Sequence, residues 1–450
     1  MRQLTITLIL IMLAIPLFLW GANKQGVLVN TNIHSTDQSA YVQYAKKMAL
    51  TNLQQVGGRN RMPIYPGLMS FLYKEKMSNE DFFQRGKAVG IIIALVVACI
   101  AFFLFRQVAP PVDAAIAILV VLFTVFAYKA PYFQTEVLFY GISLVLFYLI
   151  LSLLRTPKIS TATLAGIIAG IGHLTKASVL PALLLACLCL LLRGATSRRS
   201  RRNVANAELA SSSRVRHLLV HICYAMILLG CFLIVVFPYL QTSKERFGHY
   251  FYNVNSTFYI WCDSWEEVKQ STRAHGDRLG WPDMPKDQIP SFRKYLREHS
   301  LQSIGTRFFN GLRSLHRRTI GSYGYANFLA AYILMVGLFF GQNLRQTRSI
   351  LIQTSPSLLL FIPAYFLGYL LLYAWYAPIA GGNRFVLSLF LPALFVLLSL
   401  ISRALSNKLS FVCFKKKISA SVISPLILLF LLGYILTVFP HRVSTMYGGH

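Results

Sequence analysis

Thr36-Asp37-Gln38-Ser39-Ala40-Tyr41 opens a polar stretch of the sequence that closes on Arg59-Asn60-Arg61-Met62-Pro63-Ile64-Tyr65-Pro66. The stretch follows one apolar segment, residues 4–20, and precedes a long alternation of apolar segments and short polar turns. Apolar runs of bilayer length are typical of membrane helices. The alternation therefore predicts an all-α polytopic membrane protein in which the carboxylate and arginines of this stretch lie just outside the lipid.

The composition indicates the same class. Of the 450 residues, 55% are hydrophobic and only 13% charged, whereas about a quarter of the residues in a soluble domain are charged. Lysine and arginine total 44 against 15 acidic residues, a net charge of +29. Such an excess favours partners that carry phosphate, namely nucleic acids, anionic lipid head groups or phosphorylated substrates. The long apolar runs argue against nucleic acid, which leaves membrane lipids and a phosphate-bearing substrate.

The seven cysteines predict neither a disulfide framework nor a metal centre. All but Cys262 and Cys413 lie within apolar runs, and no C-x-x-C pair is present. Cysteine metal ligands usually occur in such pairs or at fixed spacing from histidines. We therefore predict no metal ligands, and a divalent metal cofactor has no support in the sequence.

Basic residues predict the orientation in the membrane. Arg2 precedes the first apolar segment, and residues 193–216 contain seven arginines and one acid. Because positive residues accumulate in cytoplasmic loops, the N-terminus and this loop are predicted inside and Asp37 outside. A cleaved signal peptide is the alternative for residues 1–24, and nucleic-acid binding is the alternative for the basic loop; we favour a retained helix and a topology determinant.

About eleven transmembrane helices are predicted, with the N-terminus inside and the C-terminus outside. Residues 161–192 are too long for one span and are interrupted by His173, Thr175 and Lys176. Because a charge at mid-membrane is costly, we expect two short helices that meet at an outer apex carrying Lys176. The predicted spans are residues 4–20, 88–105, 114–127, 137–154, the two halves of 161–192, 218–240, 328–340, 357–373, 386–401 and 422–438.

Polar segments divide the chain into three parts. Residues 1–240 form a transmembrane module that includes the first external loop, 21–87; residues 241–325 form a long external loop, and residues 326–450 a second transmembrane module. In the first loop, spacings of three and four after Asp37 predict a short helix along the membrane surface. Aromatic clusters in the long loop suit acceptor binding, but they are also ordinary interfacial anchors.

This topology brings one set of polar side chains to the outer face: Asp37, Arg59, Arg61, Tyr65, Glu136, His173, Lys176 and Arg384. A carboxylate can take a proton from an attacking hydroxyl, and lysine or arginine can neutralise charge on a departing phosphate. The set therefore suits the chemistry of a phosphate leaving group in a cavity beside the lipid.

Five short motifs follow one another in an order that resembles a known superfamily. They are Asp-x-x-x-Tyr at 37–41, Arg-x-Pro-x-Tyr-Pro at 61–66, Gln-Thr-Glu-Val-Leu-Phe at 134–139, Gly-x-x-x-Gly-x-x-x-Leu-Thr-Lys at 166–176, and Gly-Asn-Arg-Phe at 382–385. They resemble motifs of the GT-C glycosyltransferases, which use polyprenyl-phosphate-linked sugars. The nearest branches look like the protein O-mannosyltransferases and the lipid A aminoarabinose transferases. The loop 241–325 matches no part of this pattern.

The resemblance implies an inverting glycosyltransferase of a bacterial plasma membrane, with its active site facing outward. A polyprenyl-phosphate-linked sugar would be the donor, and a lipid, a glycan or a protein the acceptor. By the same resemblance, Asp37 is the catalytic base, the donor phosphate is bound by Lys176, Arg384 and Arg61, and the cavity is supported by Tyr65, Glu136, His173 and Arg59. Many relatives have Asp-Glu where this chain has Asp37-Gln38, which argues against a metal site that needs both carboxylates.

Each residue also has an ordinary structural interpretation. Asp37 would serve as an N-cap of the surface helix, since aspartate is preferred there. Lys176 and Arg384 would extend to lipid head groups. Glu136 would close an interfacial turn, and His173 is more often a packing residue than a ligand.

A membrane transporter or a flippase for lipid-linked sugars is the main alternative class. Such proteins usually contain inverted repeats and charges near the bilayer midplane. We find no repeat, and the candidate groups lie on one side. The sequence therefore favours the enzyme but leaves its sugar and its acceptor open.

Overall fold

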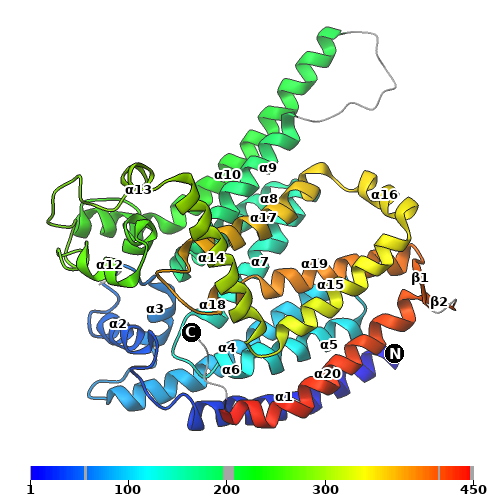
Figure 1. The fold of residues 1–450 in the computed structure, drawn as a ribbon, viewed down its shortest axis with the longest axis horizontal. Helices are drawn as coiled ribbons and strands as arrows, with labels where there is room; N and C mark the ends of the chain where they lie inside the picture. The colour runs from blue at the N-terminus through cyan, green and yellow to red at the C-terminus, as the bar shows by residue number, and fades with distance from the viewer. Residues whose placement is uncertain (1, 55–57, 196–206, 414–415, 446–450) are drawn as a thin grey trace.

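The computed structural model describes residues 2–54, 58–195, 207–413 and 416–445, which are mostly helical (Figure 1). The N-terminal part contains α1 (Arg2–Leu28), α2 (Gln38–Leu50), α3 (Ile64–Ser70), α4 (Asn79–Phe105), α5 (Pro111–Val121), η1 (Leu122–Phe126), α6 (Ala127–Lys129), α7 (Glu136–Arg155), α8 (Ile159–Thr175), η2 (Ala177–Val179), α9 (Leu180–Ala195) and α10 (Ala207–Phe247). The C-terminal part contains α11 (Val254–Thr257), η3 (Tyr259–Trp261), α12 (Trp265–Gln270), α13 (Phe292–Glu298), α14 (Leu301–Ile320), α15 (Tyr325–Gln342), α16 (Leu344–Gln353), α17 (Pro356–Tyr376), α18 (Arg384–Leu387), α19 (Phe390–Ser406), β1 (Ser410–Cys413), β2 (Lys416–Ser419) and α20 (Ala420–Thr445).

Within the described ranges, eight helices are long and apolar enough to cross a membrane. They are Ile9–Leu28, Asn79–Phe105, Pro111–Lys129, Glu136–Arg155, Ala177–Ala195, Val215–Phe247, Tyr325–Gln342 and Pro356–Tyr376. Each corresponds to one predicted span. The three remaining predicted spans correspond to the shorter apolar helices Ile159–Thr175, Phe390–Ser406 and Leu429–Thr445. The chain is therefore a multi-pass integral membrane protein.

Glycines bring α8 unusually close to α10. A Cβ atom at Gly166 would lie 2.5 Å from the carbonyl oxygen of Leu228, and one at Gly170 would lie 2.6 Å from the Cβ of Val235. Larger residues cannot fit at such distances, so the two backbones meet directly, as membrane helices with small residues do. The contact fixes the position of the C-terminal end of α8, where the predicted break of 161–192 occurs.

The first polar loop folds back on itself through α2 and α3. The ring of Tyr65 meets Tyr41 and Phe133 edge-on, with centroids 5.6 Å and 5.8 Å away. The buried amide of Gln38 accepts from the Phe133 N–H and exchanges hydrogen bonds with Asn30. These contacts join α2 to the end of α1 and to the turn before α7. The predicted short helix is therefore present, and its position at a membrane surface remains a prediction.

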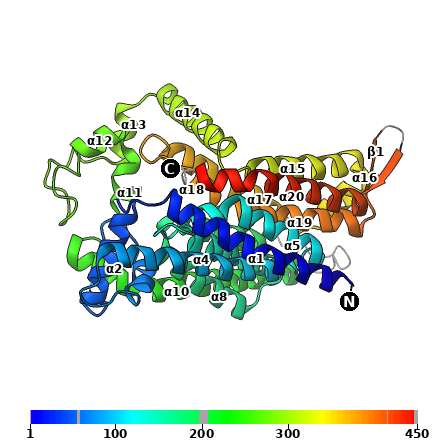
Figure 2. The same cartoon turned by 90° about the horizontal axis from the view of Figure 1, so that it is seen from below.

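The long polar segment after α10 has a small apolar core of its own. This core contains Phe247, Tyr252, Val254, Phe258, Tyr259, Cys262, Val268, Ile289 and Ile379. The segment that carries α12 and α13 lies at one end of the helical bundle in both ribbon views (Figures 1 and 2).

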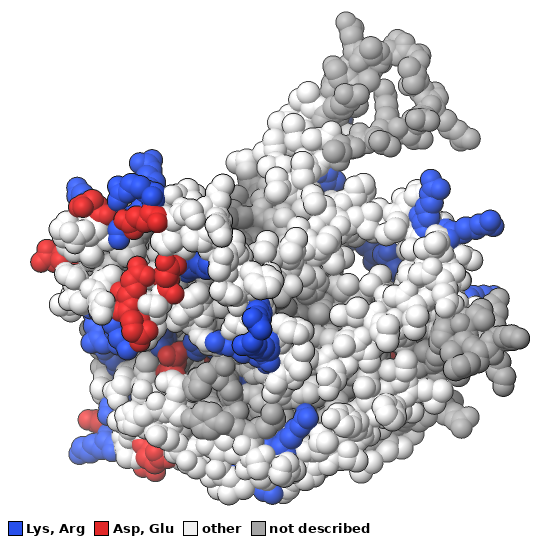
Figure 3. Space-filling model, in the orientation of Figure 1, with Lys and Arg blue, Asp and Glu red and all other residues white. Residues whose placement is uncertain are grey.

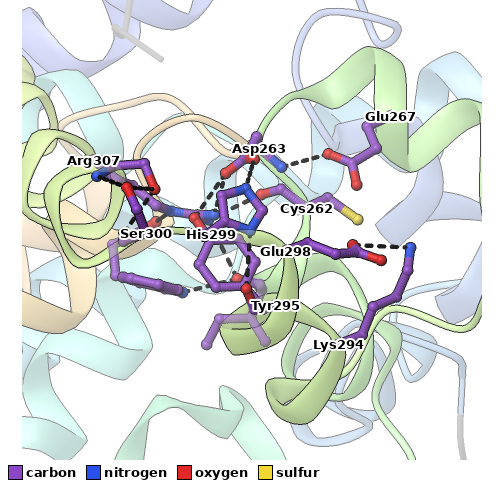
Figure 4. A network of polar contacts seen from close by, with 12 residues as sticks. Cys262, Asp263, Glu267, Lys294, Tyr295, Glu298, His299, Ser300 and Arg307 are labelled. Atoms are coloured by element: carbon purple, nitrogen blue, oxygen red, sulfur yellow. Dashed lines mark hydrogen bonds and ion pairs between the residues drawn. The ribbon is translucent and has the colours of Figure 1, made fainter.

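A polar network joins this segment to α14. Figure 4 shows the Asp263 carboxylate between Arg307 Nη1 and His299 Nε2, each 2.7 Å from one of its oxygens. The buried Arg307 also donates to the carbonyl groups of Cys262 and Trp375. The network therefore ties the long segment to the end of α17 as well.

Charged side chains are concentrated at the same end of the molecule (Figure 3). The surface over α1, α15 and α20 is largely uncharged in that view, which suits contact with lipid. A two-stranded antiparallel hairpin, β1–β2, pairs Ser410 with Ser419 and was not predicted. Most of the basic loop that supported the topology, residues 196–206, lies outside the described residues.

Candidate active site

A cavity of about 700 Å³ lies where the polar loops cover the ends of the membrane helices. Its wall combines residues from the start of α2 and α7, the break between α8 and α9, the end of α17 and the turn before α18. Six of the eight side chains singled out in the sequence line it: Asp37, Arg61, Glu136, His173, Lys176 and Arg384. Segments separated by more than 340 residues of sequence thus meet at one site.

Two arginines hold the carboxylate of Asp37. Arg61 Nη2 lies 2.7 Å from its Oδ1, and Arg384 Nη1 donates to its Oδ2 at 2.8 Å. Asp37 does occupy the N-cap position of α2, but its side chain makes no capping hydrogen bond. Helix capping therefore does not account for this carboxylate, which faces the cavity instead.

The arginines keep Asp37 ionised. Burial by itself raises the pKa of its carboxyl, but Arg61 and Arg384 outweigh that effect and hold the pKa below its ordinary value. Arg384 shows the reverse balance. Burial lowers the pKa of its guanidinium group, but the negative charges of Glu136 and Asp37 raise this pKa by more, so it lies above its ordinary value. Asp37 is therefore a carboxylate, and Arg384 a cation, throughout the physiological pH range.

A second carboxylate lies deeper in the wall. Glu136 Oε1 is 3.6 Å from Lys176 Nζ and 3.9 Å from Arg384 Nη1, and the glutamate side chain is only 4% exposed. The Lys176 ammonium also lies 5.5 Å from the ring centre of Phe139 and 5.2 Å from that of Phe385. These rings support a cation over their faces. Burial nevertheless lowers the pKa of Lys176, and Glu136 only partly offsets this.

Five buried atoms on titratable side chains of this wall have no hydrogen-bond partner among the described residues. They are Arg61 Nε, Lys176 Nζ, Arg384 Nε, Glu136 Oε2 and His173 Nδ1. Three cations against two carboxylates leave one net positive charge on the lining. Buried donors are normally satisfied, so the unused donors of three cationic side chains indicate a place for an anionic ligand.

Breaks in regular structure put Lys176 and Arg384 into the wall. Lys176 is extended, with φ −158° and ψ 124°, between α8 and η2. Arg384 follows Gly382, whose φ of +127° is open only to glycine without strain. The backbone of Arg384 is then held by the Tyr140 hydroxyl, which donates to its carbonyl at 3.1 Å.

Tyr65 and Arg59 do not line the cavity. Tyr65 is buried behind the wall, against the ring of Tyr41, which does line it. Arg59 forms an ion pair with the fully buried carboxylate of Asp277. Arg59 thus connects the first polar loop to the long segment after α10, two residues from Arg61.

The long segment contributes lining residues that the sequence did not single out. Asn253, Asn255 and Trp265 face the cavity, together with Tyr376 at the end of α17. None of the five motifs covers these positions, which meet the site only through the fold. Within the described part of the chain, no group of three His, Cys, Asp or Glu side chains could hold a metal ion.

The helices and the cavity define a multi-pass membrane protein with a charged pocket at one end of its bundle. No protein-family model and no curated protein sequence matches the chain.

Comparison of the structure with solved proteins gives distant likenesses. An Archaeoglobus fulgidus oligosaccharyltransferase tethered with an acceptor peptide containing the NVT sequon is 13% identical, with a TM-score of 0.47 over 97% of this chain and 56% of that chain. Archaeal oligosaccharyltransferase AglB from Archaeoglobus fulgidus, in complex with an inhibitory peptide and a dolichol-phosphate, gives 13% identity and a TM-score of 0.45 over 96% and 56%. ArnT from Cupriavidus metallidurans, bound to undecaprenyl phosphate, gives 12% and 0.32 over 88% and 79%. This chain spans little more than half the length of the archaeal chains, and no residue role is carried over from these structures.

Proposed function

We propose that the chain is an inverting glycosyltransferase that moves a sugar from a polyprenyl-phosphate-linked donor to a hydroxyl or amide of an acceptor lipid, glycan or protein. The observation that carries this proposal is the presence, in one cavity, of an ionised carboxylate held by two arginines and of three cations, Lys176 included, that have unused donors. The five motifs that contain these residues support it, since their order resembles that of the GT-C glycosyltransferases.

The donor phosphate binds among Arg61, Lys176 and Arg384. Each has a buried donor atom without a partner, and guanidinium N–H groups are strong ligands of phosphate oxygens. The single net positive charge of the lining matches a phosphodiester. Leu180, Pro181 and Leu372 line the same cavity from α9 and α17, and these apolar side chains suit the polyprenyl chain.

Asp37 is the general base of the transfer. The acceptor oxygen or nitrogen gives its proton to the carboxylate as its electron pair attacks the anomeric carbon. The bond from that carbon to the phosphate oxygen breaks, and its electron pair leaves with polyprenyl phosphate, so one displacement inverts the configuration. Arg61, Lys176 and Arg384 stabilise the charge that develops on the leaving phosphate.

Substrate binding also prepares the base. A carboxylate paired with two guanidinium groups accepts protons poorly, because its pKa is low. An arriving phosphate competes with Asp37 for Arg61 and Arg384, and each donor it takes raises the basicity of the carboxylate. Donor binding therefore raises the basicity of Asp37 at the moment when a proton has to be taken up.

The finer topology belongs to the same proposal. The three shorter apolar helices also span the membrane, which gives about eleven spans. The cavity then faces outward from a bacterial plasma membrane, between the transmembrane modules 1–240 and 326–450, and the external loop 241–325 contacts the acceptor. Asn253, Asn255 and Trp265 are among its contributions to the cavity.

A donor-turnover assay tests the function. Purified chain in detergent is incubated with a panel of undecaprenyl-phosphate-linked hexoses and pentoses and with a membrane extract as the source of acceptor. We expect release of undecaprenyl phosphate from one donor and transfer of its labelled sugar to extract material. If every donor stays intact while the reconstituted chain moves it across liposomes, the protein is a flippase and not a transferase.

A further inference from the structure

Three arginines on α14 have no acidic partner. Arg313, Arg317 and Arg318 take part in no ion pair and no side-chain hydrogen bond among the residues that the structure describes. Figure 3 shows basic side chains gathered over this helix. Arg317 follows Arg313 by four residues, so their charges repel on one helix face and cost stability unless an anion compensates them.

The arginines surround a groove separate from the catalytic cavity. The groove has a volume of about 490 Å³ and is lined by these arginines with Asn310 and Ser314. All five side chains carry N–H or O–H donors, and none of them carries an acid. The groove therefore offers an oxyanion several hydrogen bonds and a positive field, which is the chemistry of a phosphate ligand.

Chain connections place this groove at the level of the lipid head groups. α14 ends at Ile320, and the membrane helix α15 begins only five residues later, at Tyr325. Gly311 meets the backbone of Ala374, close to the end of the membrane helix α17, so tightly that a Cβ atom would lie 2.0 Å from the carbonyl oxygen. α14 thus runs along the boundary where two membrane helices end.

The other exposed flank of α14 carries mainly apolar side chains, beside the exposed His316. Phe309, Leu312 and Ile320 are 67%, 39% and 58% exposed. At about 100° per residue, these side chains lie on one side of the exposed surface and the basic groove lies on the other. A helix with this division lies in the membrane interface, its apolar flank toward the acyl chains and its basic flank toward the head groups.

We propose that the α14 groove binds the head group of an anionic phospholipid such as phosphatidylglycerol. The phosphodiester oxygens accept from Arg313 and Arg317, and the acyl chains lie along Phe309 and Leu312. A zwitterionic head group fits less well, because its own cation is repelled by the arginines. This lipid binds outside the catalytic cavity, so the proposal does not depend on the transferase activity.

Native mass spectrometry of the full chain tests the site. The protein is purified in a neutral detergent and mixed with phosphatidylglycerol, with phosphatidylcholine or with inorganic phosphate. We expect one retained phosphatidylglycerol, and a loss of about thirtyfold in its affinity in Arg313→Gln/Arg317→Gln, since each basic residue near an anionic lipid contributes about fivefold. Arg313→Lys/Arg317→Lys keeps the charge and most of the binding.

Two matched variants make the result decisive. Arg278→Gln/Arg293→Gln removes two exposed arginines of the long loop, and it should retain the lipid as the wild type does. Arg317→Gln alone perturbs the helix less and should lose about fivefold. Equal retention of phosphatidylcholine, unchanged binding in the double Gln variant, or displacement of the lipid by millimolar phosphate would each overturn the head-group site.

Discussion

Arg384 contacts both carboxylates of the cavity, Asp37 at 2.8 Å and Glu136 at 3.9 Å. Its backbone is fixed by Tyr140 and its loop by Asn383, whose amide donates to Ser322. Because its Nε has no partner among the described residues, Arg384 can bind a phosphate oxygen first and then exchange its contact with Asp37 for a second phosphate oxygen. The residue thus links donor binding to the state of the base.

The pH dependence of transfer tests this link. The pKa of Asp37 is lowered in the folded protein, so its carboxylate stays ionised until the pH falls below the ordinary value for aspartate, and the wild-type rate should be flat in mild acid. In Arg384→Gln, Asp37 loses one of its two arginine partners, so burial raises the pKa of its carboxyl. The acid limb of the pH–rate profile should therefore move to higher pH. Initial rates measured at donor concentrations well below KM, which report the free enzyme, from about pH 4 to about pH 8 check the shift.

Arg278→Gln serves as its control, because it removes an exposed arginine that does not line the cavity. Its acid limb should match the wild type. An acid limb that stays in place in Arg384→Gln would show that Asp37 is not the titrating base.

The sequence shows which residues are candidates for the site more readily than it shows which residues contact one another. Asp37, Lys176 and Arg384 could be singled out because a charge beside a membrane span needs a reason. The ion pair between Arg59 and Asp277 could not be predicted, because the two residues are separated by 218 positions and no sequence pattern joins them. The amide of Gln38 shows the same limit, since its acceptor bond to the Phe133 N–H spans 95 positions.

At the scale of elements, Asp277 anchors the long segment to the first polar loop. Its buried carboxylate accepts from Tyr259 at 2.7 Å and Thr272 at 3.1 Å, besides its ion pair with Arg59. Asp277→Ala leaves these donors unpaired and should destabilise the segment by about 3–5 kcal/mol. Hydrogen exchange of residues 241–290 should therefore accelerate, while Asp287→Ala, at an exposed site of the same segment, should leave it unchanged. Unaltered exchange in Asp277→Ala would refute the anchor.

Close packing of α8 on α10 has a similarly direct test. Gly166→Leu must displace the backbone of Leu228, whereas Gly230→Leu adds the same volume where no atom lies within 4 Å. Overpacking of this kind costs about 1–3 kcal/mol. Gly166→Leu should therefore lower the thermal unfolding temperature, and Gly230→Leu should leave it unchanged. Equal temperatures in the two variants would mean that the helices do not meet as described.

A helix boundary could be predicted from the sequence where only one arrangement is physically possible. Lys176 cannot lie at mid-membrane, so residues 161–192 had to break there, and α8 ends at Thr175. The basic stretch 291–318 forms two helices, α13 and α14, because Ser291 and Ser300 each cap a helix by accepting from the N–H three residues on. Serine in that position is a start signal. The hairpin β1–β2 has no comparable signal.

For the whole molecule, the proposed arrangement depends on the side of the membrane that each loop occupies. Reporter fusions after residues 36, 176 and 212 should report outside, outside and inside, since residues 36 and 176 border the cavity and 212 lies in the basic loop. Cysteine labelling at these positions in intact cells independently reports the side of the membrane that each position occupies. If residue 212 were external, or residue 36 internal, the side chains that line the cavity would lie on opposite sides of the membrane.

Hydrophobic periodicity predicts apolar helices but not the cavity between them. The lining draws on residues 37, 61, 136, 176 and 384, which come from five separate segments. Their motifs could be recognised one at a time, and only the folded chain shows that the carboxylate of Asp37 meets Arg61 and Arg384. The further lining from Asn253 to Trp265 depends on a segment whose sequence contains no such motif.

The turnover of a polyprenyl-phosphate-linked donor by Asp37→Asn tests the central claim most directly. The substitution keeps the size of the side chain and removes its capacity to take a proton, so the rate should fall between about 100-fold and 10,000-fold. Donor binding should persist, because Arg61, Lys176 and Arg384 are unchanged, and Asp287→Asn should retain full activity. Wild-type turnover by correctly folded Asp37→Asn would contradict the role of Asp37 as the base.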